Sequence, residues 1–213
     1  MFIIFDLDDT LIDTSGTVTP IALEYALERV PVDAPLEELL TLNKTAYSSF
    51  DAWQKLLKRY DAGEYIEDAV QAMQKAPIDA ITPLPGALEL LRLLAVDHRM
   101  AIVTIGDEMR QLEKLRLSGF DKKLFESIHV TPKRDKKKIY QELLAKWKTD
   151  PFNILVVGDR VTTDLQPAKE LGMRTCHIEW GRGQNNTGSK RYVDVTINAL
   201  TQVKAIAYEY QNH

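Results

Sequence analysis

The chain has little cysteine, little histidine and no strong excess of either charge. Its one cysteine, Cys176, cannot form an internal disulfide, and its four histidines show no pair at the spacing of a zinc site. The 27 basic and 31 acidic residues leave a net charge of −4, so no basic field of the kind that holds nucleic acid covers the protein. These shortages argue against disulfide-stapled, zinc-dependent and nucleic-acid-binding proteins.

Long apolar segments are also missing. The apolar run at residues 1–5 is cut by Asp6, which makes it too short for a signal peptide or a membrane span. We therefore expect a cytosolic protein with no membrane partner. A length of 213 residues, with 45% hydrophobic and 27% charged residues, suffices for one large domain or a domain with an insertion.

Short apolar runs alternate with segments of helical periodicity in the second half of the chain. The apolar runs occupy residues 100–104, 127–130, 153–157, 174–178 and, more weakly, 193–197. The helical segments occupy 108–118, 135–147 and 164–171. Continuously apolar strands separated by helices indicate a parallel sheet covered on both faces, in which residues 2–5 form a further strand. The pattern predicts an α/β core of Rossmann-like type.

The interval between residues 5 and 100 is longer than one crossover helix needs. Residues 85–96 supply that helix after several breakers, which leaves about 65 residues over. We therefore predict a core made of residues 1–16 and 83–213 and an inserted helical domain at 17–82. Its expected helices lie at 20–29, 35–60 and 64–76, with hinges at 14–19 and 81–85.

One apolar stripe runs through the expected insertion at steps of three or four residues. It consists of Ala46, Phe50, Trp53, Leu57 and Tyr60, which would share one face of a single helix. A surface that stacks on a ligand could look the same. We favour the interpretation that the stripe is the core of the insertion itself.

Polar residues gather where the expected strands end. Parallel sheets bind ligands at the carboxyl ends of their strands. The residues at or soon after these ends are Asp6, Asp8, Thr104, Lys133, Asp159 and Asp164. Asp6 and Asp8 point to the same side of their strand, and with Asp159 opposite they would repel one another unless a cation lay between them. Oxygen ligands of this kind favour Mg²⁺.

Four segments in order resemble the motifs of the haloacid dehalogenase-like hydrolase superfamily. They are DLDDT at residues 6–10, the apolar run ending in Thr104, a lysine ahead of a helix, and GDRVTTD at 158–164. The resemblance covers residues 1–13 and 82–180, which is the expected core. It implies a Rossmann-like parallel sheet with a helical cap inserted between the first and second motifs.

The resemblance also implies an activity, that of a phosphatase acting on a small phosphorylated metabolite. Asp6 would be the nucleophile that forms an aspartyl-phosphate, and Asp8 the general acid and base. Thr104 would hydrogen-bond a phosphoryl oxygen. Lys133 would neutralise charge on Asp6 and on the phosphoryl group.

For the metal, the same resemblance implies a magnesium ion held by three aspartates. The carboxylates of Asp6 and Asp159 and the backbone carbonyl of Asp8 would contact it. Asp164 would orient the lysine or a metal-bound water. It would either contact the magnesium directly or hydrogen-bond the groups that do.

The choice of lysine depends on where the following helix begins. Asp135 could cap a helix running to residue 147, which would leave Lys133 two residues earlier, in the loop. Lys136, Lys137 and Lys138 would then lie in the first turn. Because several lysines lie together, the position of the catalytic lysine stays open by a residue or more.

Alternative functions remain open at this point. A phosphomutase of the same superfamily uses the same aspartates, and a phosphonatase would need a lysine in the cap, such as Lys44, Lys55, Lys58 or Lys75. A phospho-receiver or regulatory protein also combines aspartate, magnesium, threonine and lysine, but its accepting aspartate lies on a later strand. Arg182, in the loop after the run at 174–178, could touch the substrate. The sequence indicates neither the substrate nor the oligomeric state.

Overall fold

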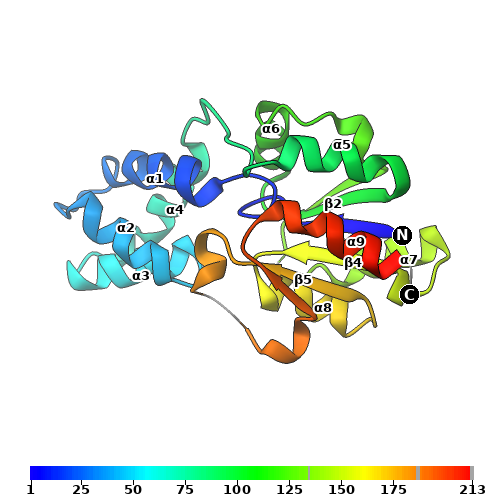
Figure 1. Ribbon diagram of the computed structural model, residues 1–213. Helices are drawn as coiled ribbons and strands as arrows, with labels where there is room; N and C mark the ends of the chain where they lie inside the picture. Colours follow the sequence, from blue (N-terminus) through cyan, green and yellow to red (C-terminus); the bar gives the residue numbers. More distant parts are fainter. Residues whose placement is uncertain (134, 186–187, 212–213) are drawn as a thin grey trace.

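The computed structural model describes residues 1–133, 135–185 and 188–211 and shows an α/β core joined to a helical unit (Figure 1). The core holds a six-stranded parallel sheet with strand order β3-β2-β1-β4-β5-β6. The strands are β1 (Phe2–Phe5), β2 (Arg99–Ile105), β3 (Ser127–Thr131), β4 (Ile154–Gly158), β5 (Arg174–Ile178) and β6 (Val195–Ile197). The Rossmann-like α/β fold predicted from the alternating apolar runs is therefore confirmed.

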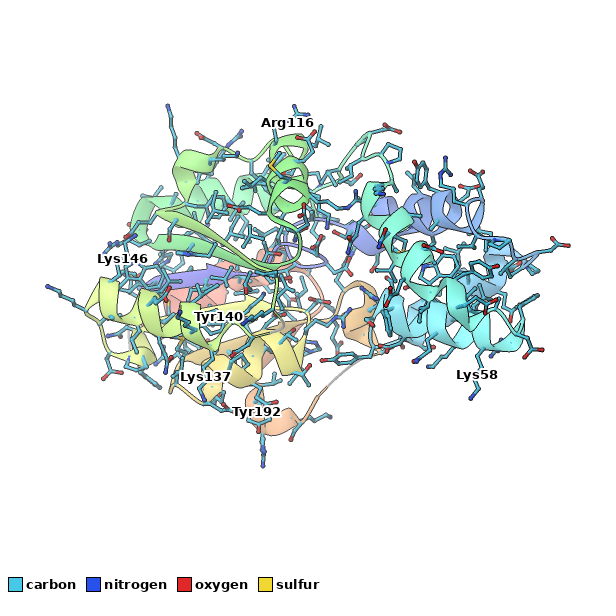
Figure 2. The ribbon with its side chains drawn as sticks, turned by 180° about the vertical axis from the view of Figure 1, so that it is seen from behind. Lys58, Arg116, Lys137, Tyr140, Lys146 and Tyr192 are labelled. Carbon is cyan, nitrogen blue, oxygen red and sulfur yellow. The ribbon has the colours of Figure 1, made fainter. Side chains whose placement is uncertain are left out.

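Helices cover both faces of the sheet because neighbouring strand residues point to opposite sides. Ile3 packs into one buried cluster with α5 (Ala87–Asp97), α6 (Glu108–Leu117) and α9 (Val203–Gln211). Ile4 packs into another with α7 (Lys137–Trp147) and α8 (Gln166–Lys169). Figure 2 shows Tyr140 on α7, where this helix meets the sheet, and Tyr140 is 1% exposed.

The helical unit consists of four helices that lie between β1 and α5 in the chain. They are α1 (Thr14–Leu27), α2 (Leu36–Thr45), α3 (Ser49–Arg59) and α4 (Ile66–Lys75). They enclose a separate apolar core around the fully buried Trp53, whose indole N–H donates to Met73 Sδ at 3.0 Å. Figure 1 shows this unit standing beside the core, at the left of the view.

The single helix expected at residues 35–60 is wrong, because the chain breaks between α2 and α3. Ser48 caps α3: its hydroxyl accepts from the Asp51 amide at 3.2 Å and donates to the Asp51 carboxylate at 2.7 Å. This reciprocal pair stabilises a helix start that the apolar periodicity does not reveal.

The break also divides the predicted stripe. Ala46, Trp53 and Leu57 are buried in the core of the helical unit, as expected for the core interpretation. Phe50 and Tyr60, by contrast, are 43% and 37% exposed, so for them the prediction is wrong. Ala46 ends α2 while the others belong to α3 or its end, and one continuous face therefore does not exist.

Two chain segments lying side by side connect the core with the helical unit. The Asp13 amide donates to the Thr82 carbonyl at 2.8 Å, and the Leu84 amide donates to the Leu11 carbonyl at 2.9 Å. The hinge expected at 14–19 stays a prediction, and its residues form the first turns of α1, which begins at Thr14 and is capped by the Asp13 carboxylate. The domain boundaries at 16/17 and 82/83 stay a prediction, and the first of them falls inside α1.

None of the helices in the described part of the chain is both long and apolar enough to cross a membrane. The cytosolic location stays a prediction.

Candidate active site

The sheet register brings the first, second and fourth strand ends to one edge. Phe5 pairs with Ile102 of β2 on one side and with Val157 of β4 on the other. Asp6 follows Phe5 directly. Thr104 of β2 and Asp159 after β4 therefore flank Asp6, each one residue further along the chain than the residue level with Asp6. These three predicted residues thus come together at the carboxyl edge of the sheet, as expected of a ligand site.

Asp6 lies at the centre of this edge and is only 8% exposed. Its carboxylate accepts from the Lys136 ammonium at 2.6 Å. Burial raises the pKa of Asp6 to about 7, because Lys136 offsets the loss of solvation only in part and Asp164 and Asp8 add repulsion.

Lys136 connects two of the aspartates. Its ammonium contacts the Asp164 carboxylate at 2.8 Å in addition to Asp6, and the side chain is 1% exposed. Burial disfavours the charged ammonium, but the two carboxylates outweigh it and raise the Lys136 pKa. Lys136 is therefore a cation held between two buried anions.

The structure corrects the prediction that the Lys133 side chain lies beside Asp6. Lys133 is exposed, and its backbone hydrogen-bonds the Thr131 side chain. The helix α7 begins at Lys137, one residue later than expected, and the Asp135 carboxylate accepts from the Lys137 amide at 2.9 Å just before it. Lys136 is then the residue just before the helix, and its side chain reaches Asp6.

Asp159 and Asp164 complete an acidic cluster with Asp6. One carboxylate oxygen from each lies within 4.8 Å of the others, and all three residues are buried. Burial, followed by repulsion from Asp164 and Asp9, raises the pKa of Asp159 well above its usual range, despite the nearby Arg160. Three buried carboxylates with one lysine among them leave excess negative charge that favours a cation.

A glycine allows Asp164 to approach this cluster. A Cβ atom on Gly158 would lie 2.5 Å from a carboxylate oxygen of Asp164, which is far inside contact distance. Asp164 lies on the helical turn Val161–Leu165, and the same oxygen accepts from the Arg160 amide at 2.9 Å. The glycine and the second aspartate of GDRVTTD are therefore coupled by packing.

The Asp8 carboxylate turns away from the acidic cluster and towards α6. It accepts from Lys114 Nζ at 2.7 Å, from Gln111 Nε2 at 2.7 Å and from the Thr14 hydroxyl. Gln111 Nε2 also donates to the Thr104 hydroxyl at 2.7 Å. Burial works to raise the pKa of Asp8, but the charge of Lys114 and these hydrogen bonds prevail and lower it.

Gln111 and Lys114 are site residues that the sequence interpretation missed. They are three residues apart and so lie on one face of α6, and both are buried although their types are mostly exposed. Polar residues at this spacing, just after the strand that ends near Thr104, are a signal that could have indicated them.

Asp9 supports the loop instead of joining the cluster. Its backbone is left-handed, with φ of 57°, a conformation that aspartate tolerates better than most residues. Its carboxylate accepts from the backbone amide and the hydroxyl of Ser15 at the start of α1. These contacts and the left-handed backbone give Asp9 a role in the turn that leads into α1.

A cavity of about 330 Å³ opens above the acidic cluster, between the core and the helical unit. Its lining includes Asp6, Asp8 and Thr104 from the core and Ala22 and Ser49 from the helical unit. An anionic ligand at its base would meet a lysine, a threonine hydroxyl and the carboxylate cluster.

Two arginines at the cavity connect the core to the helical unit through backbone oxygens. Arg110 of α6 donates to the Gln74 carbonyl at 3.0 Å and to the Ala76 carbonyl at 2.8 Å, at the end of α4. Arg160 donates to the Tyr47 carbonyl at 2.8 Å, between α2 and α3. The helical unit is thus held over the strand ends.

This arrangement has the parts that phosphoryl transfer needs. Asp6 offers an oxygen nucleophile, Lys136 and Thr104 can contact an anion beside it, and Asp8 stands near with a separate set of partners. Such chemistry depends on placing groups and stabilising charge more than on covalent work by the protein.

Comparisons with known proteins agree with this geometry. The pattern described as haloacid dehalogenase-like hydrolase matches residues 3–178. A glyceraldehyde 3-phosphate phosphatase of Pyrococcus furiosus is 32% identical over 94% of this chain and 90% of its own length. A phosphoglycolate phosphatase of Synechococcus elongatus is 27% identical over 84% of each. The crystal structure of the HAD-hydrolase YfnB of Bacillus subtilis, described as bound to magnesium with interdomain movement, superposes with a TM-score of 0.74 at 20% identity over 97% of each chain.

Proposed function

The chain belongs to the haloacid dehalogenase-like hydrolases and is a phosphatase of that family, and from this we propose that it is a magnesium-dependent enzyme that hydrolyses a small phosphomonoester through an aspartyl-phosphate on Asp6. The observation that carries the proposal is the contact of Asp6 with Lys136 at the base of the cavity. A buried lysine that pairs with a strand-end aspartate can bind the phosphoryl group without displacing the nucleophile.

The acidic cluster fits magnesium on its chemistry. The donors are carboxylate oxygens only, and they lie close enough to share one small ion after minor adjustment. We assign Asp6 and Asp159 as carboxylate ligands and the Asp8 backbone oxygen as a third ligand. Asp164 holds Lys136 and the Arg160 amide. A bound magnesium would offset the carboxylate charge and stabilise the charge of the phosphoryl group.

In the first step, Asp6 forms a bond to phosphorus as the ester oxygen leaves. Lys136 favours the ionised form of Asp6, since its charge lowers a pKa that burial would otherwise raise further. Lys136 and Thr104 then hydrogen-bond the phosphoryl oxygens. The departing alkoxide takes a proton from Asp8 and leaves as the alcohol.

In the second step, a water molecule attacks the aspartyl-phosphate and restores Asp6. Asp8 accepts the proton of that water, which returns it to the acid form. Lys114 holds Asp8 in the ionised state and so suits this second step. For the first step, Asp8 must gain a proton and move from Lys114 towards the leaving oxygen.

The helical unit supplies the cavity wall that faces the rest of the substrate. Relatives named for glyceraldehyde 3-phosphate and phosphoglycolate make small phosphorylated metabolites the first compounds to screen. A phosphonatase reading finds no support, because no lysine of the helical unit is among the described residues lining the cavity. Lys58, for example, projects outwards from α3 in Figure 2. A phosphomutase would use the same aspartates.

The test is release of inorganic phosphate from an aryl phosphate and from a panel of phosphometabolites, with magnesium and with chelator. Asp6→Asn keeps the shape of the side chain but loses the charge, so turnover should fall at least about 1,000-fold with the fold intact. Asp121→Asn is the matched control, because Asp121 is exposed and asparagine can still cap its short helix.

An active Asp6→Asn variant would remove the proposed nucleophile. Phosphate release that proceeds equally in chelator would remove the metal. Transfer to a second sugar phosphate without phosphate release would identify a phosphomutase, and a phosphoenzyme lasting for minutes would identify a receiver.

A further inference from the structure

The cavity between core and helical unit is lined by five cationic side chains. Four of them have an oxygen partner between 2.6 and 2.8 Å: Lys136 on Asp6, Lys114 on Asp8, Arg110 on the Ala76 carbonyl and Arg160 on the Tyr47 carbonyl. The fifth is Arg182, and its surroundings differ from those of the other four.

Arg182 lies on the short turn Gly181–Gln184 after β5, under the helical unit. Its Nε is buried and has no hydrogen-bond partner, and Nη1 makes one long contact of 3.4 Å to the Ser49 hydroxyl of α3. Among the residues that the structure describes, no carboxylate oxygen lies within 4.0 Å of the Arg182 guanidinium.

A guanidinium in such a place is incompletely compensated. Burial lowers the pKa of Arg182, and the charge of Arg160 lowers it further, while Asp9 and Asp159 act against this only from a distance. Arg182 as a whole is half-buried, and a cation that loses water without gaining a hydrogen-bonded anion costs free energy. Arginine presents a planar set of donors that match a carboxylate or phosphate, so an oxyanion is the ligand that would satisfy it.

We propose that Arg182 binds a carboxylate on the part of the substrate that is released, so that the preferred substrates are phosphorylated acids. This inference rests on the proposed phosphatase function. The phosphoryl group has its own partners at the ends of β1 and β2, where Lys136 and Thr104 lie. Arg182 comes from the other side, after β5 and beside Ser49 of the helical unit, where the remainder of the substrate lies.

Ser49 has a part in this assignment because its hydroxyl is the group of the helical unit that Arg182 contacts. It is the first residue of α3, so the contact joins the recognition of substrate to the start of a helix in the unit above the cavity. A substrate carboxylate placed there would bridge the core loop and the helical unit. Arg182 is then a specificity-determining residue, while Asp6 and Lys136 act on the phosphoryl group.

The experiment compares two compounds that differ at one carbon. D-3-phosphoglycerate carries a carboxylate where glycerol 3-phosphate carries a hydroxymethyl group, and each is measured as a competitive inhibitor of aryl phosphate hydrolysis. The wild-type protein should bind the carboxylate compound at least about 10-fold more tightly, the effect of one charge-assisted hydrogen-bond pair. Arg182→Gln should bring the two inhibition constants to within about 2-fold of each other.

Two further variants keep the result interpretable. Arg182→Lys retains the charge and should keep part of the preference, and Arg191→Gln, an exposed arginine outside the cavity, should keep all of it. Equal inhibition by both compounds in the wild-type protein would overturn the proposal, and so would an Arg182→Gln variant that keeps the preference. If the proposed function itself is wrong, the wild-type protein releases no phosphate from the aryl ester or Asp6→Asn stays active, a result separate from the preference.

Discussion

Replacing Lys136 by methionine tests the centre of the site directly. Its ammonium lies 2.6 Å from Asp6 and 2.8 Å from Asp164, and all three side chains are under 10% exposed. Methionine fills most of the volume but leaves two buried carboxylates without their cation. Breaking a buried ion pair in this way costs about 3–5 kcal/mol, a large part of the about 5–15 kcal/mol that stabilises a domain.

The sign of the pH dependence follows from the same contacts. Lys136 lowers the pKa of Asp6, so without it that pKa rises above its present value of about 7. An acid whose pKa is raised on folding destabilises the fold as the pH rises from its unfolded pKa to its folded pKa, because the ionised form is the one that folding disfavours. A higher folded pKa extends this loss beyond pH 7. The deficit of Lys136→Met should therefore be larger at pH 8 than at pH 5.5.

Urea unfolding at the two pH values measures the deficit, and hydrolysis of an aryl phosphate measures the activity, which should fall about 100-fold or more. The matched control is Lys133→Met, on an exposed lysine three residues away, which should change stability by less than about 0.5 kcal/mol. Adding Asp164→Asn to Lys136→Met should restore part of the stability, since one unpaired charge disappears, but should not restore turnover.

The reasoning is refuted if Lys136→Met is as stable as the wild-type protein at pH 8. It is also refuted if Lys133→Met is the inactive variant of the pair.

The other predictions concern the metal and Asp8. Magnesium should raise the melting temperature more at pH 8 than at pH 6, because protons compete with the metal for Asp6 and Asp159, whose pKa values are raised. Thermal melts measure this rise, and Asp159→Asn should lose most of it. An equal rise at both pH values would count against the metal site. Lys114→Met should raise the pKa of Asp8, which Lys114 lowers, so that Asp8 keeps its proton to higher pH. In the pH–rate profile of an alkyl phosphate, the alkaline limb should then move to higher pH, while the alkaline limb for an activated aryl phosphate should stay in place. Profiles that do not differ from wild type would contradict the role of Asp8 as the acid.

The α/β core could be predicted because each element carries its own local signal. Strands such as Ile154–Gly158 are apolar throughout, and a sheet buried on both faces requires this. The positions of Asp6, Thr104 and Asp159 follow from the same runs, since each stands where a run ends. Their roles in catalysis stay a prediction, whereas their proximity is a finding of the structure.

The catalytic lysine could not be assigned in the same way, because the choice depends on the residue at which the helix begins. Asp135 was expected to precede the helix directly, whereas α7 begins at Lys137, one residue later. The run of lysines gives no periodic signal to decide between these starts. Side-chain reach then selects Lys136, which only the three-dimensional structure shows.

The partners of Asp8 were missed for a different reason. Gln111 and Lys114 contact Asp8 across about 100 residues of sequence, and such a pairing follows from the packing of α6 beside the loop after β1. The break between α2 and α3 was missed because Ser48 and Asp51 act as a local pair, and apolar spacing carries no trace of it.

The hydrogen bonds of Arg110 and Arg160 to the helical unit have an evolutionary consequence. Both arginines hold carbonyl oxygens of the main chain, which every amino acid provides. Substitutions at residues 47, 74 and 76 leave these acceptors in place as long as the helix ends keep their positions. The side chains of the helical unit that line the cavity are therefore free to diverge. Descendants of this protein can acquire new substrates while the hydrogen bonds between the core and the helical unit are inherited unchanged.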